Sequence, residues 1–216
     1  MWNKARLHQA LWNSIKVGVI ASIISTFIAL FAAKAFTRYK VRFRGLSYGA
    51  ILLPFIIPEI IIAVAFIVIW TSMGLKLGLI PITISHVLYC TPFCLLILIS
   101  RMEGFDKSLE EASMDLGENA FGTFWRITFP LLLPGIVASL LLSFVISFDE
   151  FILAFFLSSS DQTLPIYMWS QLRFPKKLPH VLALGAIIIV ATSFIVMLSY
   201  WFRNIGQSKN NKNMEI

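Results

Sequence analysis

Three acidic side chains lie inside long apolar stretches of this sequence: Glu59, Asp149 and Glu150. A charged side chain near the middle of a bilayer costs at least about 2.5–3.5 kcal/mol on insertion scales, so such residues usually face a cavity or a partner. Pro54 and Pro58 precede Glu59, and prolines leave backbone carbonyl groups that must also find a partner or line a cavity. Carboxylates along such a route would suit a cationic substrate.

Two interpretations of these acids are open. In the first they line a substrate pathway, and in the second they pair with Lys16 or Lys34 or lie near a membrane face. Asp149 and Glu150 are about 100° apart on a helix. We therefore expect only one of these two to point into a path.

The remaining reactive side chains form no catalytic or metal-binding pattern. Cys90 and Cys94 lie four residues apart, but a structural zinc site takes four ligands and no second pair is present, so we expect packing residues. His86, one turn earlier, is expected to hydrogen-bond between helices. The sequence contains neither G-x-x-x-x-G-K-[ST] nor a nucleophile–base arrangement, so we expect no enzyme, no cofactor and no ATP site of its own.

The elements that hold these residues are apolar runs long enough to cross a membrane. The chain is 58% apolar and 13% charged, with a mean hydropathy of +0.81. A spanning helix needs about twenty apolar residues, and in hydrocarbon its backbone must be hydrogen-bonded internally. Five stretches meet or nearly meet this length, at about 11–36, 50–74, 79–100, 130–157 and 179–202. The sequence predicts an all-α integral membrane protein with a single domain over 1–216.

Lysine and arginine are unequally distributed between the two sides of these spans. Ten lie on the side of the 101–129 loop and the 203–216 tail, and six lie on the other side. The positive-inside rule places the ten-residue side, including the C-terminus, in the cytoplasm. The net charge of +7 is what inner-face loops against anionic lipid would give, so nucleic-acid binding is not needed to explain it.

The loop between the third and fourth spans has the pattern of a helix–turn–helix. Gly117 separates two apolar stripes, and Pro130 follows at the start of the next span. The stripes consist of Leu109, Ala112, Ser113 and Leu116, and of Ala120, Phe121, Phe124 and Trp125. Such a loop is either a connector resting on the membrane surface or a docking site for a partner.

The same loop resembles the EAA signature of ABC importer permeases, which is Glu-Ala-Ala, three residues, Gly, nine residues, Ile, any residue, Leu, Pro. The matching residues are Glu111, Ala112, Ser113, Gly117, Ile127 and Pro130. Ser113 stands where the family usually has Ala, and Phe129 where it usually has Leu. The resemblance implies that these residues dock into a groove on a cytoplasmic ABC ATPase subunit, which would bind the ATP.

Other segments resemble spermidine/putrescine-type permeases, and within that group the second of the two permease subunits. They are Thr37–Gly45, Ser85-His86, Ser100–Asp106, Ser147–Phe151 and Thr163-Leu164-Pro165. The resemblance implies a six-span fold of which five spans are visible, with the first span expected upstream of Met1. A signal peptide ending near Ala33-Lys34-Ala35 is an alternative explanation of the N-terminus, but the run is long and more spans follow.

The resemblance also implies the setting in which the chain works. We expect one half of a heterodimeric pore in the bacterial inner (cytoplasmic) membrane, with a second permease subunit. We also expect a periplasmic or extracellular substrate-binding protein, which would dock near 158–177. Glu59, Asp149 and Glu150 would then line a polyamine path. The alternatives are a permease for another substrate, such as ferric iron or a phosphonate, and a truncated, non-transporting membrane paralogue.

Overall fold

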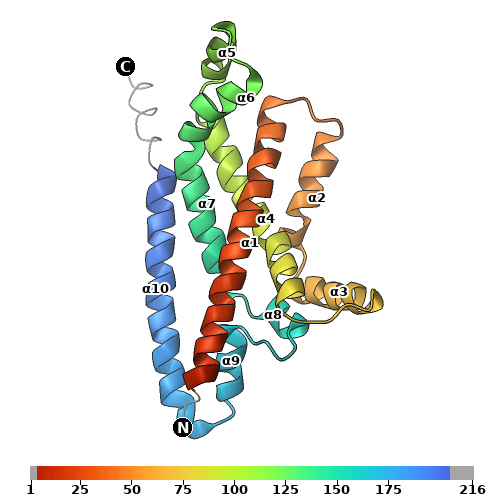
Figure 1. Ribbon diagram of the computed structural model, residues 1–216, viewed down its shortest axis with the longest axis vertical. Helices are drawn as coiled ribbons and strands as arrows, with labels where there is room; N and C mark the ends of the chain where they lie inside the picture. Colours follow the sequence, from red (N-terminus) through yellow and green to blue (C-terminus); the bar gives the residue numbers. More distant parts are fainter. Residues whose placement is uncertain (1–3, 205–216) are drawn as a thin grey trace.

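The computed structural model describes residues 4–204, which form an elongated bundle of helices (Figure 1). Three long helices pack against one another: α1 (Lys4–Arg38), α4 (Leu79–Glu103) and α7 (Phe129–Asp149). A fourth, α10 (Leu178–Asn204), runs along α7. These helices match the all-α prediction. Most of the expected 203–216 tail lies outside the described residues.

The core between α1, α4 and α7 uses small and polar side chains for close packing. The hydroxyl groups of Ser25 and Thr26 both lie 3.6 Å from the sulfur of Cys94. Cys90 donates to the carbonyl oxygen of Ser143 at 3.5 Å. Small residues let membrane helices approach closely, and thiols and hydroxyls add hydrogen bonds between them. The two cysteines therefore pack between helices, as the sequence predicts.

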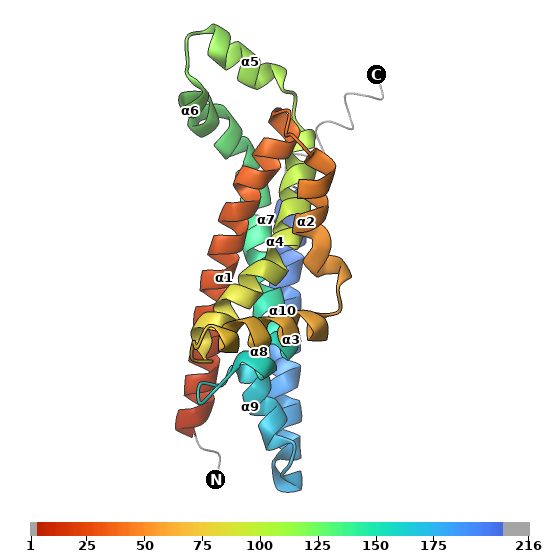
Figure 2. The same ribbon diagram turned by 90° about the vertical axis from the view of Figure 1, so that its right-hand side faces the viewer.

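The expected span over 50–74 is a broken helix. It consists of α2 (Arg44–Ile56) and α3 (Glu59–Ser72), which are bent by 104°. The break falls at Ile57 and Pro58, because the residue before a proline avoids the α conformation and proline lacks an N–H. Figures 1 and 2 show α3 lying across the long axis of the bundle. Within residues 4–204, four helices are long and apolar enough to cross a membrane, and the bent pair makes a fifth if it is one span.

The expected span over 130–157 is also divided between two helices. The helix α7 ends at Asp149, Glu150 is extended, and the short helix α8 (Ile152–Leu157) follows. The carboxylate of Glu150 accepts hydrogen bonds from the backbone N–H groups of Leu153 and Ala154. A side chain that caps a new helix in this way competes with continuation of the old one.

The segments that connect the long helices lie at the two ends of the bundle. The α1–α2 connection, α5 (Ser108–Asp115), α6 (Ala120–Thr123) and the end of α10 lie at one end, which we call the loop end (Figure 1). The start of α1, α9 (Leu164–Gln171) and the 3₁₀ turn η2 (Pro175–Lys177) lie at the other. This arrangement matches the grouping of segments used to count positive charge. Figure 2 shows α5 projecting beyond the ends of the long helices, with α6 about level with the end of α1.

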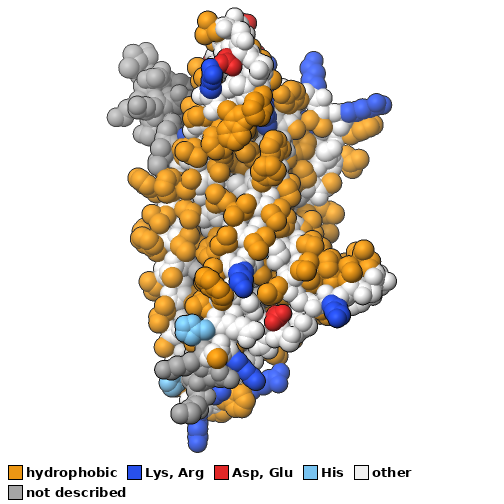
Figure 3. Space-filling view, viewed as in Figure 1, with side chains coloured by type: hydrophobic (Ala, Val, Ile, Leu, Met, Phe, Trp, Pro, Cys, Tyr) orange, Lys and Arg blue, Asp and Glu red, His pale blue; other side chains and the backbone are white. Residues whose placement is uncertain are grey.

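The outer surface is apolar along the middle of the bundle. Figure 3 shows apolar side chains over most of this face, with most lysine and arginine side chains toward its two ends. The helix α10 is the least covered of the long helices. Only 11% of an 18-residue apolar stretch of this helix is buried inside the protein. Side chains such as Ile187, Val190 and Phe194 are more than half exposed. A surface of this kind suits contact with lipid hydrocarbon.

Candidate functional site

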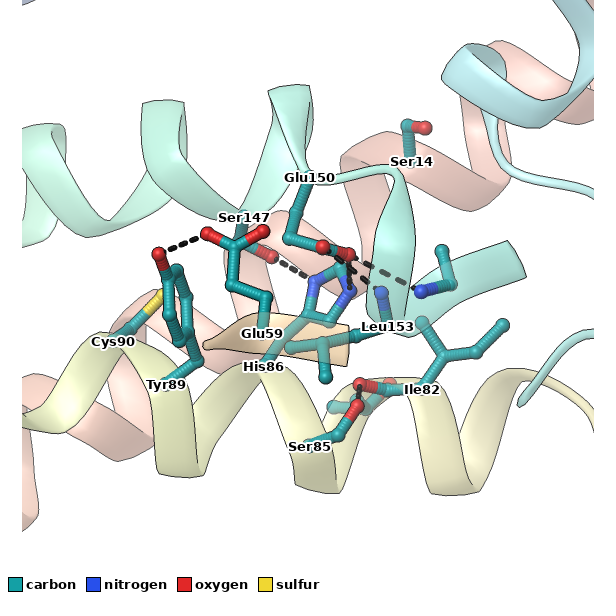
Figure 4. Close-up of polar contacts among 12 residues, drawn as sticks. Ser14, Glu59, Ile82, Ser85, His86, Tyr89, Cys90, Ser147, Glu150 and Leu153 are labelled. Atoms are coloured by element: carbon teal, nitrogen blue, oxygen red, sulfur yellow. Dashed lines mark hydrogen bonds and ion pairs between the residues drawn. The ribbon is translucent and has the colours of Figure 1, made fainter. Parts of the chain in front are cut away.

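Glu59 begins α3 directly after the break, where a helix N-terminus favours negative charge. Its carboxylate accepts a hydrogen bond from the hydroxyl of Tyr89 on α4 (Figure 4). Two further rings continue from Tyr89, with centroid distances of 5.8 Å to Phe93 and 5.2 Å from Phe93 to Phe55. Glu59 and Tyr89 are both partly exposed. The break therefore holds a carboxylate beside aromatic rings, a combination that attracts cations.

Glu150 lies in a different environment, with fixed partners on several elements. Its Oε2 lies 3.2 Å from Nε2 of His86, and Nδ1 of His86 lies 2.7 Å from the hydroxyl of Ser147 (Figure 4). The Nε2 contact has ion-pair distance but not hydrogen-bond geometry. The N–H groups of Leu153 and Ala154 approach the carboxylate at 2.9 and 3.1 Å. Glu150 thus ties α4, α7 and α8 together.

Asp149 points away from Glu150, as the helical angle between them predicts. It lines a groove of about 410 Å³ between α7, α9 and α10, whose other walls are apolar side chains such as Met168, Trp169 and Ile188. The hydroxyl of Thr192 on α10 lies near the carboxylate of Asp149. Asp149 therefore faces the α10 side of the molecule.

The structure brings together two of the three predicted acids. Glu59 and Glu150 meet Tyr89 and His86, which are neighbouring residues of one stretch of α4 (Figure 4), while Asp149 lies in the separate groove. Glu59 is paired with Tyr89 and Glu150 with His86, whereas Lys34 lies over the ring of Phe124 at 4.3 Å. Sequence reasoning anticipated that His86 would hydrogen-bond between helices, but not that Tyr89 would meet Glu59. The pairing depends on the bend after Ile57, which the sequence signals only through Pro58.

The loop-end segment has the expected helix–turn–helix form. The helix α5 ends before Gly117, whose φ of +94° lies in the region that favours glycine. The side chain of Asn119 then caps α6 by accepting the N–H of Gly122 at 2.8 Å. A single π-helical stretch, η1 (Phe124–Thr128), leads into α7, and such stretches are frequent at functional sites.

At the start of this segment the backbone N–H of Ser108 hydrogen-bonds the carboxylate of Asp106 at 2.9 Å. That hydrogen bond lowers the pKa of Asp106 from its usual range, because it favours the charged form.

The residues of the EAA-like pattern occupy different positions in this segment. Glu111 and Ala112 are exposed, and Glu111 forms an ion pair with Lys107 one turn away at 2.9 Å. Ser113 is partly buried, and its hydroxyl lies 3.1 Å from that of Thr123, so it joins the two limbs of the loop. Ile127 is partly buried in η1, and Pro130 is exposed in the first turn of α7.

The outward face of the loop is apolar. Leu116 is 88% exposed and Phe121 is 74% exposed, and Leu109, Met114 and Trp125 are exposed to a lesser degree. Phe124 is the exception within the second stripe, because it turns inward and joins the core. An apolar face of this kind marks either a partner or the membrane surface.

The inward face of α5 carries a buried acid that sequence reasoning missed. Glu110 is 7% exposed; its Oε2 lies 2.9 Å from Nε of Arg38, and its Oε1 accepts a hydrogen bond from Thr128 at 2.6 Å. Glu110 and Ser113 are three residues apart and share the inward face. Spacing gave no clear signal, because Glu110 lies about 100° from Leu109 on the helix, at the edge of the predicted apolar stripe that includes Ser113.

These features, a helical membrane bundle with a projecting helix–turn–helix, define a class of transport protein. Residues 25–209 match the family model described as binding-protein-dependent transport system inner membrane component. The chain belongs to this family. It is therefore a multi-pass inner-membrane transport component and not an enzyme, and the family implies an ATPase and a substrate-binding protein as partners.

Within the family the chain is similar to named polyamine permeases. It is 30% identical over 200 residues to the spermidine/putrescine transport system permease protein PotC of Escherichia coli (strain K12), covering 92% of this chain and 75% of PotC. It is 27% identical over 215 residues to the putrescine transport system permease protein PotI of the same strain, covering 95% of this chain and 76% of PotI.

A solved structure gives the same fold. A chain of the inward-facing MetNI methionine ABC transporter superposes with a TM-score of 0.69 at 17% identity, covering 92% of this chain and 99% of that one. At this identity the likeness concerns the fold alone.

Proposed function

We propose that this chain is the permease subunit of an ATP-driven, binding-protein-dependent importer of polyamines, and that it forms one half of a pore with a second permease subunit. The observation that carries the substrate assignment is the 30% identity to PotC across 92% of the chain. The aromatic-flanked carboxylate of Glu59 supports it, because an elongated cation that loses hydration in a pore needs such compensation.

Among the three acids, we assign the substrate pathway first to Glu59. It accepts a side-chain hydrogen bond from Tyr89 and is partly exposed. Its carboxylate therefore has acceptor positions left for hydrogen bonds from a passing ammonium group. Glu150 already meets His86 and two backbone N–H groups. Asp149 faces the groove beside α10. These two acids are weaker candidates for contact with the substrate.

We further propose that the loop end is cytoplasmic and that the loop docks on the ATPase. The positive charge on this side, including Lys40, Arg42 and Arg44, supports the orientation and with it a cytoplasmic C-terminus. The exposed apolar face around Leu116 and Phe121 supports docking, because it is otherwise left in water. Glu111, Ala112 and Gly117 would lie at or beside that contact.

Uptake by the complete transporter in proteoliposomes tests the function. We expect ATP- and binding-protein-dependent accumulation of labelled spermidine or putrescine, inhibited by the unlabelled polyamine. Ferric iron and a phosphonate serve as competitors of different chemistry and should not inhibit. Accumulation of either competitor in place of polyamine would reject the substrate assignment.

A further inference from the structure

The loop end contains a buried charged cluster that the docking proposal does not use. Glu110 and Glu111 are neighbours, yet Glu111 is exposed toward solvent and Glu110 is buried against the bundle. The partners of Glu110 are Arg38 on the last turn of α1 and Thr128 at the end of η1. One carboxylate thus joins the loop helix both to the first long helix and to the segment that enters α7.

Arg38 is itself held in place by contacts on a third element. Its Nη2 donates to the carbonyl oxygen of Met102 near the end of α4 at 3.1 Å. Its guanidinium lies over the ring of Phe105 with its central carbon 4.8 Å from the ring centroid. Arg38 and Glu110 have side chains that are 10% and 9% exposed. The Arg38–Glu110 contact has ion-pair distance but not hydrogen-bond geometry. Removing one partner of a buried ion pair is costly, because it leaves the other charge uncompensated.

The second limb of the loop is tied to the first by hydroxyl contacts. Thr128 is 1% exposed where it donates to Glu110, and Ser113 meets Thr123 across the turn. The contacts of Glu110 and Ser113 therefore tie α5 to the bundle, while Leu109 and Met114 on the same helix are exposed. This is the arrangement of an element with one face fixed to its own chain and the other presented to a partner.

We infer that the Arg38–Glu110–Thr128 cluster is the anchor through which displacement of the loop reaches α1, α4 and α7, with Glu110 as its central positioning residue. The inference rests on the proposed function, because the loop has a displacement to transmit only if it docks on the ATPase. The exposed residues make the contact in this scheme. The buried cluster converts that contact into movement of the membrane helices.

The test uses the complete transporter reconstituted in proteoliposomes, and measures how strongly the substrate-binding protein stimulates ATP hydrolysis. Glu110→Gln keeps the side-chain shape but removes the charge that holds Arg38. We expect the stimulation to fall by about fivefold or more, which is the usual scale of coupling between sites. Recovery of the ATPase subunit with the permease should be unchanged, because the exposed face is intact.

Three variants separate a loss of transmission from general damage to the protein. Asp115→Asn, an exposed neutralisation on the same helix, should keep the stimulation within about twofold of the parent. Arg38→Lys retains a positive charge at the anchor and should keep more of the stimulation than Arg38→Gln. Equal losses in Asp115→Asn and Glu110→Gln would overturn the inference.

If the Glu110→Gln transporter assembles poorly, a second variant provides the test. Thr128→Val removes one hydrogen bond and leaves the ion pair, so we expect a loss of about twofold to threefold in stimulation. Normal stimulation in the assembled Glu110→Gln or Thr128→Val transporter contradicts the anchor. A parent transporter that hydrolyses ATP on stimulation but takes up no polyamine rejects the substrate proposal instead.

Discussion

The break at α3 and the loop end both hold carboxylates, but the two regions surround them differently. Glu110 at the loop end and Glu150 near the break each meet several fixed partners in buried positions. Glu59 is partly exposed and accepts a hydrogen bond from one tyrosine. An acid with several fixed partners holds the protein together, whereas an acid with one partner can still bind a moving cation. The number of fixed partners therefore distinguishes the two kinds of acid better than position in an apolar run does.

The largest effect that we expect comes from Gly117→Val at the loop end. A Cβ at this position meets no atom within 4 Å, so the obstruction is the backbone conformation at φ +94° and not a clash. A β-branched residue held there costs about 1–3 kcal/mol, which would distort the turn between the two limbs of the loop. We expect uptake to fall by more than about tenfold. Membrane insertion should be unaffected.

Gly117→Asn is the matched control, because asparagine tolerates positive φ better than valine does. It should keep clearly more uptake than Gly117→Val at equal protein level. Normal uptake and ATPase association in Gly117→Val would reduce the loop to a passive connector.

At the break, we expect Glu59→Gln to lower spermidine or putrescine uptake by about tenfold, which corresponds to ~1.4 kcal/mol. The substitution keeps the shape and the contact with Tyr89 but removes the charge that would compensate a desolvated ammonium. Initial uptake rates at matched protein level provide the measurement. Tyr89→Phe, which leaves the carboxylate in place, should have a smaller effect. Uptake in Glu59→Gln equal to the parent would remove Glu59 from the path.

Glu150→Gln should affect stability more than transport. The amide can still accept a backbone N–H, but the substitution removes the carboxylate oxygen that lies 3.2 Å from Nε2 of His86. We expect an apparent melting temperature lower by about 2–6 °C in detergent, and uptake within about threefold of the parent once protein levels are matched. A tenfold loss of uptake at unchanged melting temperature would instead place Glu150 on the path.

The smallest effect is expected for Asp149→Asn. Its side chain faces the mostly apolar groove beside α10, and an amide keeps the same shape there. Uptake should stay within about twofold of the parent. A large loss confined to uptake would show that the groove, and not the break, carries the cation.

The sequence predicted the fold class and the loop, because both depend on local patterns. Run length identified the apolar helices, and glycine and proline marked the turn at Gly117 and the start of α7. The two broken spans were missed, although Pro58 and the Asp149-Glu150 pair lie at the breaks. Run length alone does not distinguish a straight helix from one that changes direction.

The sequence could not predict which side chains pair with one another at the two sites, and the reason is different. Arg38 and Glu110 are 72 positions apart, and Glu59 and Tyr89 are 30 apart. Such pairs form only after the helices have packed, and no spacing rule connects them. The divergence of Asp149 and Glu150 was accessible, since it follows from the rotation per residue along a helix.

The division between a cation path at the break and a coupling device at the loop end is tested most directly by measuring uptake and ATP hydrolysis together. Parent, Glu59→Gln and Gly117→Val transporters would be compared in proteoliposomes with the binding protein present. We predict that Glu59→Gln keeps stimulated ATP hydrolysis while losing polyamine uptake, and that Gly117→Val loses the stimulation itself. Loss of both activities to the same extent in both variants would contradict the account.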